Sequence, residues 1–237
     1  MSEKVVVSRS KLVAVADAIR SKTETTESLT LDAMPSKIAE IEGGSEVVFD
    51  GLPLGYGKCD YIQFTDAQIV DTGIICTEAT KIRFVFMREL ATQHYMMGVA
   101  SSDNTASVTA YLGGSWRFGN KSASKGPYVN ASDEIVYTGV FDNSQITVTN
   151  NKTTISSVNA FETVGSLLIG GCRNSDGTLG TPQFVGKIFQ FEMWVGSEQV
   201  LKLMPVVSFD GVYRFWDSVS KTFFDSITDI ALLGGNF

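Results

Sequence analysis

Most of the chain repeats one pattern, in which a short run of β-forming residues is followed by a turn. In one such run, Ile82, Phe84 and Phe86 recur at every second position, which is the period of a strand with one buried face. No long helical pattern separates the runs, and strands spaced about 8–12 residues apart predict an antiparallel β-sandwich or jelly roll. The candidate strands are residues 47–49, 61–64, 81–87, 94–100, 107–112, 115–118, 134–141, 145–149, 153–156, 166–170, 184–195, 212–216 and 221–224.

The C-terminal part of the chain is rich in aromatic strands. Residues 184–195 alternate with period 2, and the side that we expect in a core carries Phe189, Phe191, Met193 and Val195. Gly186 at the entry of this strand predicts a bulge or the close approach of another backbone. Residues 212–216 and 221–224 flank a turn at residues 217–220, and together they predict a hairpin.

Residues 1–44 differ from the rest because they predict helices. Residues 11–20 and residues 35–40, with Pro35 in the first turn, form two short amphipathic runs. Their apolar faces carry Leu12, Val15, Ala16, Ile19, Ile38 and Ile41. Two helices this short cannot form a stable core alone, so they need a partner. We expect either a cap on the β domain of residues 45–237 or a segment for attachment and oligomerisation.

Composition and charge argue against several classes of protein. The chain has 237 residues, of which 43% are hydrophobic and 19% charged, as is typical of a globular protein. A net charge of -7 without clustered Lys and Arg argues against nucleic-acid binding. No apolar run approaches about 18 residues, and the N-terminus lacks the layout of a signal peptide. We therefore expect a soluble protein that neither enters a membrane nor leaves by the general secretory route.

Residue patterns of catalytic and metal sites are absent as well. His94 is the single histidine, so His-His metal motifs are ruled out. Cys59, Cys76 and Cys172 fit neither a disulfide framework nor a zinc site, and we expect buried free thiols. Retaining glycosidases need two carboxyl groups about 5 Å apart, and the acidic pairs with suitable spacing lie at a helix end or among turn residues. We expect no enzyme and no metal.

Two segments of the predicted β domain and one N-terminal segment resemble a known family. Residues 61–73 (Tyr-Ile-Gln-Phe-Thr-Asp-Ala-Gln-Ile-Val-Asp-Thr-Gly) resemble the opening of the concanavalin-like, laminin-G-like jelly-roll domains in tail and appendage proteins of phages and prophages of Gram-positive gut bacteria. Residues 186–194 (Gly-Lys-Ile-Phe-Gln-Phe-Glu-Met-Trp) resemble a late strand of these domains, and residues 205–235 follow in the family's order. Residues 12–38 resemble the segment that precedes many such domains. Phe64, Asp66 and Asp225 depart from the family's pattern, which affects loop detail.

This resemblance implies a virion structural protein of the tail, appendage or receptor-binding type. Its fold would be mainly β, an antiparallel jelly-roll β-sandwich at residues 45–237 behind a short α-helical segment at residues 1–44. The family leads us to expect attachment to other virion proteins through residues 1–44, homo-oligomers that are often trimers, and assembly into the virion in the host cytoplasm. Decoration of a capsid or tail without a specific ligand stays open, as does, less strongly, a glycan-degrading enzyme.

The sandwich of this family also implies carbohydrate binding on the host surface. Such domains stack aromatic rings on sugars, and binding residues concentrate on loops of a rigid scaffold. The candidates in the loop-rich interval 111–130 are Trp116, Arg117, Asn120, Tyr128 and Asn130. The alternative is that Trp116 and Tyr128 complete the core, since large aromatic residues are mostly buried. A calcium ion is common in laminin-G-like domains, but residues 101–104 and 174–177 are better explained as turns than as calcium loops.

Overall fold

In the computed structural model, the chain divides into two compact units. By their internal contacts, the two units are Met1–Val48 and Phe49–Phe237. The described residues are 9–23, 30, 52–53, 55–89, 94–103, 105–112, 116–123, 136–142, 145–148, 151–154, 159–180 and 184–236.

The first unit contains helix α1 (Arg9–Thr23), which includes the helix predicted at residues 11–20. Ala16 and Ile19 are buried and Leu12 is half buried. Val15, which was expected on the same face, is 38% exposed and does not belong to the buried stripe. The second predicted helix, with Ile38 and Ile41, lies outside the described residues.

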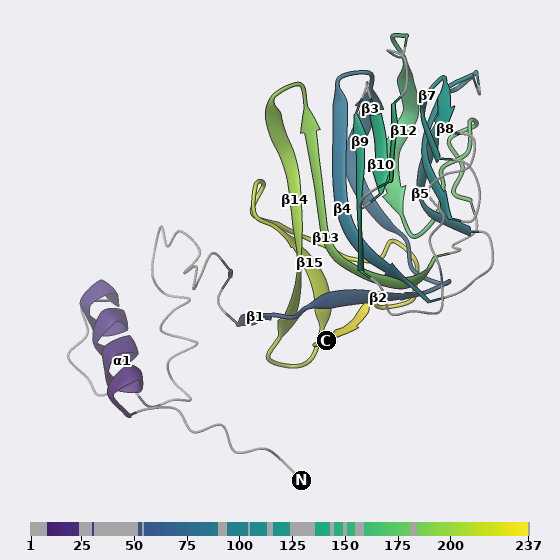
Figure 1. Cartoon of the computed structure of the whole chain (residues 1–237). Coiled ribbons are helices and arrows are strands. Elements are labelled where there is room, and N and C mark those ends of the chain that lie inside the picture. Colours follow the sequence, from purple (N-terminus) through teal and green to yellow (C-terminus); the bar gives the residue numbers. More distant parts are fainter. Residues whose placement is uncertain are drawn as a thin grey trace. The chain divides into compact units, whose positions relative to one another are not determined.

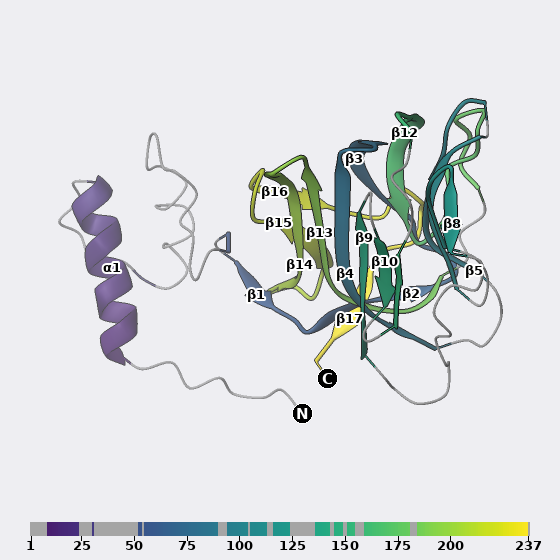
Figure 2. The same cartoon turned by 45° about the horizontal axis from the view of Figure 1, so that its top comes forward.

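The second unit is mainly β and consists of two antiparallel sheets (Figures 1 and 2). The larger sheet has the order β11-β10-β9-β4-β13-β14-β15-β16, with β1 on β14, β2 on β13 and β17 on β2. Its strands are β1 (Tyr56–Lys58), β2 (Tyr61–Thr65), β4 (Thr80–Arg88), β9 (Val136–Asp142), β10 (Gln145–Val148), β11 (Asn151–Thr154), β13 (Val185–Val195), β14 (Glu198–Ser208), β15 (Tyr213–Asp217), β16 (Thr222–Phe224) and β17 (Leu233–Gly235).

The smaller sheet has the order β3-β12-β5-β6-β7-β8. Its strands are β3 (Val70–Thr77), β5 (His94–Ala100), β6 (Ser107–Leu112), β7 (Trp116–Gly119), β8 (Lys121–Ala123) and β12 (Glu162–Ile169). The alternation of side chains along each strand gives both sheets one apolar face, and these two faces meet. The result is a sandwich-like pair of sheets around a shared core.

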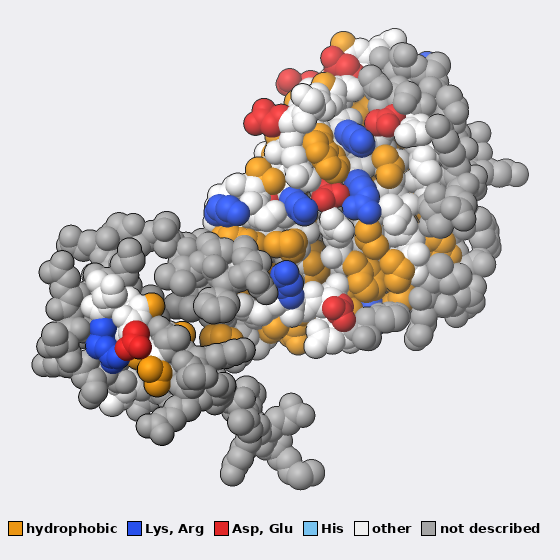
Figure 3. Space-filling view, turned by 60° about the vertical axis from the view of Figure 1, so that its left-hand side comes forward, with side chains coloured by type: hydrophobic (Ala, Val, Ile, Leu, Met, Phe, Trp, Pro, Cys, Tyr) orange, Lys and Arg blue, Asp and Glu red, His pale blue; other side chains and the backbone are white. Residues whose placement is uncertain are grey.

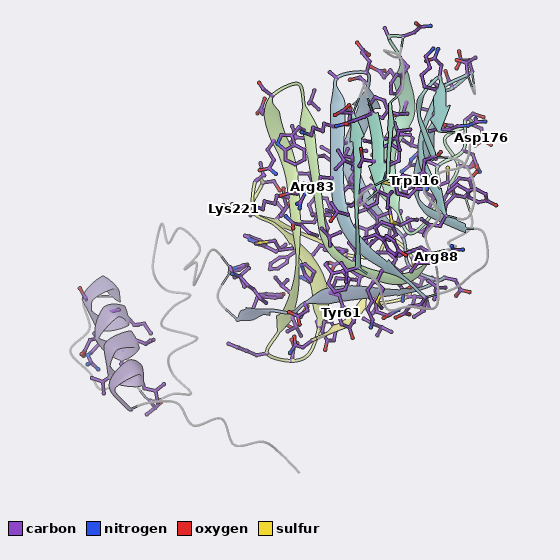
Figure 4. All side chains as sticks on the ribbon, in the orientation of Figure 1. Tyr61, Arg83, Arg88, Trp116, Asp176 and Lys221 are labelled. Atoms are coloured by element: carbon purple, nitrogen blue, oxygen red, sulfur yellow. The ribbon has the colours of Figure 1, made fainter. Side chains whose placement is uncertain are left out.

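Aromatic rings from both sheets fill the centre of this core. The indole of Trp116 on β7 stacks on Phe141 of β9, with ring centroids 5.2 Å apart and planes 4° from parallel. Phe84 of β4 lies 5.7 Å from the same indole, measured between centroids. All three side chains are fully buried, and Figure 4 shows Trp116 among the densely packed side chains inside the unit. Burial of aromatic surface thus contributes to holding the two sheets together, beside the aliphatic residues of the same core.

Strand β13 corrects one detail of the predicted core. Its register against β4 shifts between Ile188 and Gln190, which is the mark of a β-bulge. Because the bulge breaks the alternation, Ile188 is fully buried in the core, while Phe189 is only half buried and its ring meets Tyr61 edge-on at 6.0 Å. The predictions that Phe189 and Val195 belong to the core are wrong, and Val195 is 39% exposed.

Gly186 and the predicted hairpin behave as expected from the sequence. A Cβ atom on Gly186 would lie 2.2 Å from the carbonyl oxygen of Met87, so the close approach of another backbone is confirmed. Strands β15 and β16 form the hairpin, and the buried carboxylate of Asp217 accepts hydrogen bonds from the backbone N–H groups of Lys202, Val219 and Ser220. The turn is therefore held by a fully satisfied buried charge.

Strand β14 was not predicted, because Pro205 interrupts its sequence. The structure accommodates this proline where the neighbour of β14 changes. Pairing with β13 ends at Leu203, and pairing with β1 begins at Val206. The missing N–H of Pro205 therefore breaks no ladder on that side, while pairing with Phe215 of β15 continues on the other.

The outer face of the larger sheet carries charges in alternation with apolar groups, and charged and apolar side chains lie side by side in the view of Figure 3. On this face, the largely buried carboxylate of Glu192 lies 3.0 Å from Arg83 and 3.8 Å from Lys202. The two cations compensate for the burial of the carboxylate.

Candidate functional site

A pocket of about 600 Å³ opens on the outer face of the smaller sheet. Its size is that of a site for a small molecule. The lining residues come from β5, β6, β7 and the segment after β12, and they are Tyr95, Ala100, Ser107, Thr109, Tyr111, Arg117, Cys172, Arg173, Asn174 and Ser175.

The alternation of strand β6 decides which of its side chains reach the pocket. Val108, Ala110 and Leu112 point into the core, so Ser107, Thr109 and Tyr111 face outward. The register places Tyr95 of β5 opposite Tyr111, and Arg117 of β7 opposite Thr109. Three neighbouring strands thus bring two tyrosines, two hydroxyl residues and one guanidinium onto one surface.

A segment after β12, residues 172–175, forms one wall of this pocket. Its backbone is bound to β5, because the N–H of Arg173 donates to the carbonyl of Gly98 and the carbonyl of Arg173 accepts from the N–H of Ala100, each at 3.1 Å. A Cβ atom on Gly98 would lie 2.7 Å from the sulfur of Cys172, so a glycine is needed where the wall crosses the strand.

The side chain of Arg173 anchors this wall from behind. Its Nη2 lies 2.7 Å from the carboxylate of Asp71 on β3, and its other nitrogens donate to the carbonyls of Ser166 and Gly177 at 3.3 and 3.1 Å. The guanidinium of Arg173 therefore fixes the wall to β3 and to the neighbouring backbone. The turn beyond it contains Asp176, which is labelled in Figure 4. Its carboxylate accepts a hydrogen bond from the backbone N–H of Thr178 at 2.9 Å.

Two tyrosines and an arginine give the pocket its chemical character. The rings of Tyr95 and Tyr111 lie 4.6 Å apart between centroids and are tilted by 46°. Arg117 is exposed, in contrast to Arg173. Burial raises the pKa of the Tyr95 hydroxyl, as do Cys172 and Tyr111, while the charge of Arg117 acts in the opposite direction. The register places Arg117 opposite Thr109, two positions along β6 from the Tyr111–Tyr95 pair.

The lining combines groups that can contact a polar ring. The lining residues offer aromatic faces, hydroxyls, an amide and a guanidinium, but include neither Asp, Glu nor His. The described residues contain no group of His, Cys, Asp and Glu side chains suited to a metal ion. Acid-base chemistry of the kind used by glycosidases would need carboxyl groups that the described lining does not supply.

The five residues predicted to bind carbohydrate have different positions in the structure. Arg117 lies in the pocket. Trp116 is fully buried and belongs to the core, so its ring cannot act as a sugar-stacking platform, and the alternative reading of this residue holds. Asn120 is exposed at the turn between β7 and β8, outside the lining. Tyr128 and Asn130 lie outside the described residues.

Sequence reasoning missed the tyrosine pair and the wall. Tyr111 stands at the start of the loop-rich interval but was assigned to a strand, and Tyr95 carried no signal of its own. A signal did exist in the alternation of β6 and β7, since Arg117 must face away from Trp116 and Phe118. The wall was seen only as a turn at residues 174–177.

The two turns considered for calcium are held by their own hydrogen bonds. The carboxylate of Asp103 accepts from the hydroxyl of Ser101 at 2.6 Å and from the N–H of Thr105 at 3.1 Å. Asp176 binds Thr178 in the same way, and these bonds lower the pKa of both carboxyl groups. Turn chemistry thus accounts for both acidic residues.

The cysteines are free thiols. Cys59 and Cys76 are buried, as predicted, whereas Cys172 is only half buried because it lines the pocket. Burial raises the pKa of Cys172 to about 11, so its thiol stays protonated near neutral pH. A protonated thiol is a weak nucleophile, so we expect Cys172 to react slowly near neutral pH.

Fold and pocket together describe a β-sandwich-like protein with a polar pocket that is partly lined by aromatic residues. No family model and no curated protein matches this chain. Among the described residues, no helix combines the length and the apolar character required to cross a bilayer.

Proposed function

We propose that this chain is a phage virion protein of the tail or appendage type whose two-sheet unit binds a carbohydrate on the host surface. The observation that carries the proposal is the pocket on the smaller sheet, with Tyr95, Tyr111 and Arg117 around hydroxyl and amide groups. Sugars offer apolar ring faces for stacking and hydroxyls for hydrogen bonds, and the lining matches both features.

The described geometry suggests a role for each part of the pocket. The tilted pair of Tyr95 and Tyr111 offers aromatic surface against which a pyranose ring can pack. The hydroxyl of Thr109 and the amide of Asn174 are placed on the floor and the wall, where they can orient sugar hydroxyls. Three paired strands, β5, β6 and β7, carry this surface, and such a scaffold favours binding because little order must be created when the ligand enters.

The setting in a virion is supported by sequence. Residues 61–73 and 186–194 resemble jelly-roll domains of phage appendages, and the jelly-roll topology of the concanavalin-like, laminin-G-like kind is proposed on the same basis. Residues 1–44 would attach the protein to other virion proteins and hold a homo-oligomer, with a trimer as our proposal. On α1, Val13 and Val15 are 49% and 38% exposed, and such apolar side chains would be available for packing against another chain.

The proposal is tested with the full chain, fluorescently labelled and incubated with a panel of Gram-positive gut bacteria, before and after mild oxidation of their surface sugars. We expect staining of some strains that disappears after oxidation. Tyr111→Ala should abolish staining. Phe209→Ala is the matched control, because it removes a ring that is 89% exposed at the tip of the β14–β15 hairpin, away from the pocket residues.

Two outcomes would decide against carbohydrate recognition. If a multivalent form of the chain stains no strain, receptor binding fails, and decoration of a capsid or tail without a ligand replaces it. If staining survives oxidation and the Tyr111→Ala change, the chain binds cells through another surface. A release of reducing sugar from host envelopes would instead favour a glycan-degrading enzyme.

A further inference from the structure

The charges of the pocket point to a particular class of sugar. The ten lining residues include two arginines and neither Asp nor Glu, although the whole chain carries 26 acidic and 19 basic residues. An acidic protein repels anions over most of its surface. Because the lining of this pocket contains cations and no carboxylate, the pocket should repel anions less than the rest of the surface does.

Only one of the two arginines is available to a ligand. The guanidinium of Arg173 is neutralised by Asp71 at 2.7 Å and donates to two backbone carbonyls. Arg117 is exposed, and no described carboxylate forms an ion pair with it. The uncompensated charge of the lining thus belongs to Arg117.

The position of Arg117 relates this charge to the aromatic surface. Arg117 pairs across strands with Thr109, two residues before Tyr111 on β6, and Tyr111 pairs with Tyr95. Since residues i and i+2 of a strand share a face, the guanidinium lies next to the tyrosine pair on the same outer surface. A ring packed on the tyrosines would therefore present its substituents to Arg117.

We infer that this pocket selects acidic sugars, in which one acidic group binds the guanidinium of Arg117 while the sugar ring packs on Tyr95 and Tyr111. A guanidinium matches the planar geometry of a carboxylate and also binds phosphate and sulfate, often through two parallel hydrogen bonds. The shared chemistry is a single anionic group on a pyranose. This inference rests on the proposed carbohydrate-binding function and adds the class of ligand to it.

The test measures binding of four sugars with one ring to the full chain by isothermal titration calorimetry and by ligand-observed NMR. The sugars are glucose, glucuronic acid, glucose 6-phosphate and glucose 6-sulfate. We expect at least one acidic sugar to bind about 10- to 100-fold more tightly than glucose, and added salt to weaken only the acidic sugars. The acidic sugar that binds best identifies the anionic group.

Variants separate the charge from the rest of the pocket. Arg117→Gln should reduce the affinity for the acidic sugar to that for glucose, whereas Arg117→Lys, which keeps the charge but loses the planar fork, should retain part of the preference. Lys58→Gln is the matched control, because it removes one exposed cation from β1 of the larger sheet and should change nothing.

The outcomes distinguish this inference from the proposed function. If glucose and the acidic sugars bind equally, or if Arg117→Gln leaves the preference intact, selection by charge is refuted while carbohydrate binding stands. If none of the four sugars binds and no cell surface is stained, both the inference and the proposed function fall.

Discussion

Replacing Trp116 tests whether this residue belongs to the core or to a ligand site. Its indole is fully buried, stacked on Phe141 and close to Phe84. Truncation of a buried Trp to Ala costs about 3–5 kcal/mol, because apolar burial is lost and a cavity remains. A typical domain has a free energy of unfolding of about 5–15 kcal/mol, so Trp116→Ala removes a large fraction of it.

The assay is urea unfolding of the full chain, followed by far-UV circular dichroism. With a slope of about 2 kcal/mol per molar urea, a loss of about 4 kcal/mol lowers the midpoint by about 2 M. Trp116→Phe keeps a ring in the cavity and should cost only about 1–2 kcal/mol. Trp194→Ala is the control, since Trp194 is half exposed on the larger sheet and its loss should cost about 1–2 kcal/mol.

A different result would refute this assignment. If Trp116→Ala unfolds at the same urea concentration as the natural chain, the indole is not part of the core. If Trp116→Phe stays folded but loses the binding of cells or sugars, the residue contacts the ligand after all.

Two further predictions concern the wall and a turn. Gly98→Ala places a methyl group 2.7 Å from the sulfur of Cys172, so it should displace the wall, destabilise the fold by about 1–3 kcal/mol and weaken ligand binding. Thermal unfolding measures the loss of stability, and sugar titration measures the loss of binding. The control is Gly57→Ala on β1, where an added Cβ meets nothing within 4 Å and should have little effect. Equal effects of the two substitutions would contradict the steric argument. The carboxyl of Asp103 should titrate at a pKa of about 2 rather than 3.8 in carbon-detected NMR, because Ser101 and the Thr105 amide hydrogen-bond its charged form. Because the pKa of Asp103 is lower in the folded chain than in the unfolded chain, its charged form stabilises the fold above pH 3.8, and this stabilisation is lost as the pH falls toward about 2. Ser101→Ala should therefore raise the titration midpoint of Asp103. An unchanged titration midpoint would exclude the hydrogen bond as the cause of the low pKa.

Local patterns predicted much of the two-sheet unit, because the alternation of buried and exposed side chains along a strand depends on residues that are close in sequence. Strands β5 and β6 have the predicted bounds, and the alternation of β4 is confirmed. Strand β14 is missing from the predicted strands. It can contain Pro205 because its neighbouring strand changes at this position, and this change depends on non-local pairing. The bulge that moves Phe189 out of the core is likewise a matter of pairing between strands.

The pocket was less accessible to prediction, because it is built from non-local pairings. Arg117 was selected for its residue type within a loop-rich interval, and it does line the pocket. Its neighbours Tyr95 and Tyr111 meet only through the register of β5 and β6. Trp116 was selected on the same grounds but is buried, because the alternation of β7 places it on the opposite side of the strand from Arg117.

The way the wall is fixed has a consequence for how this protein can diversify. Main-chain hydrogen bonds to β5 and the ion pair of Arg173 with Asp71 hold the wall, whereas Asn174 and Ser175 line the pocket from the same segment. Arg173 and Asn174 belong to both the support and the lining, because Arg173 also faces the pocket and the amide of Asn174 donates to the hydroxyl of Thr178 at 3.1 Å. If the pocket binds a sugar as proposed, substitutions at Ser175 can change its specificity with less effect on the wall than substitutions at Arg173 or Asn174.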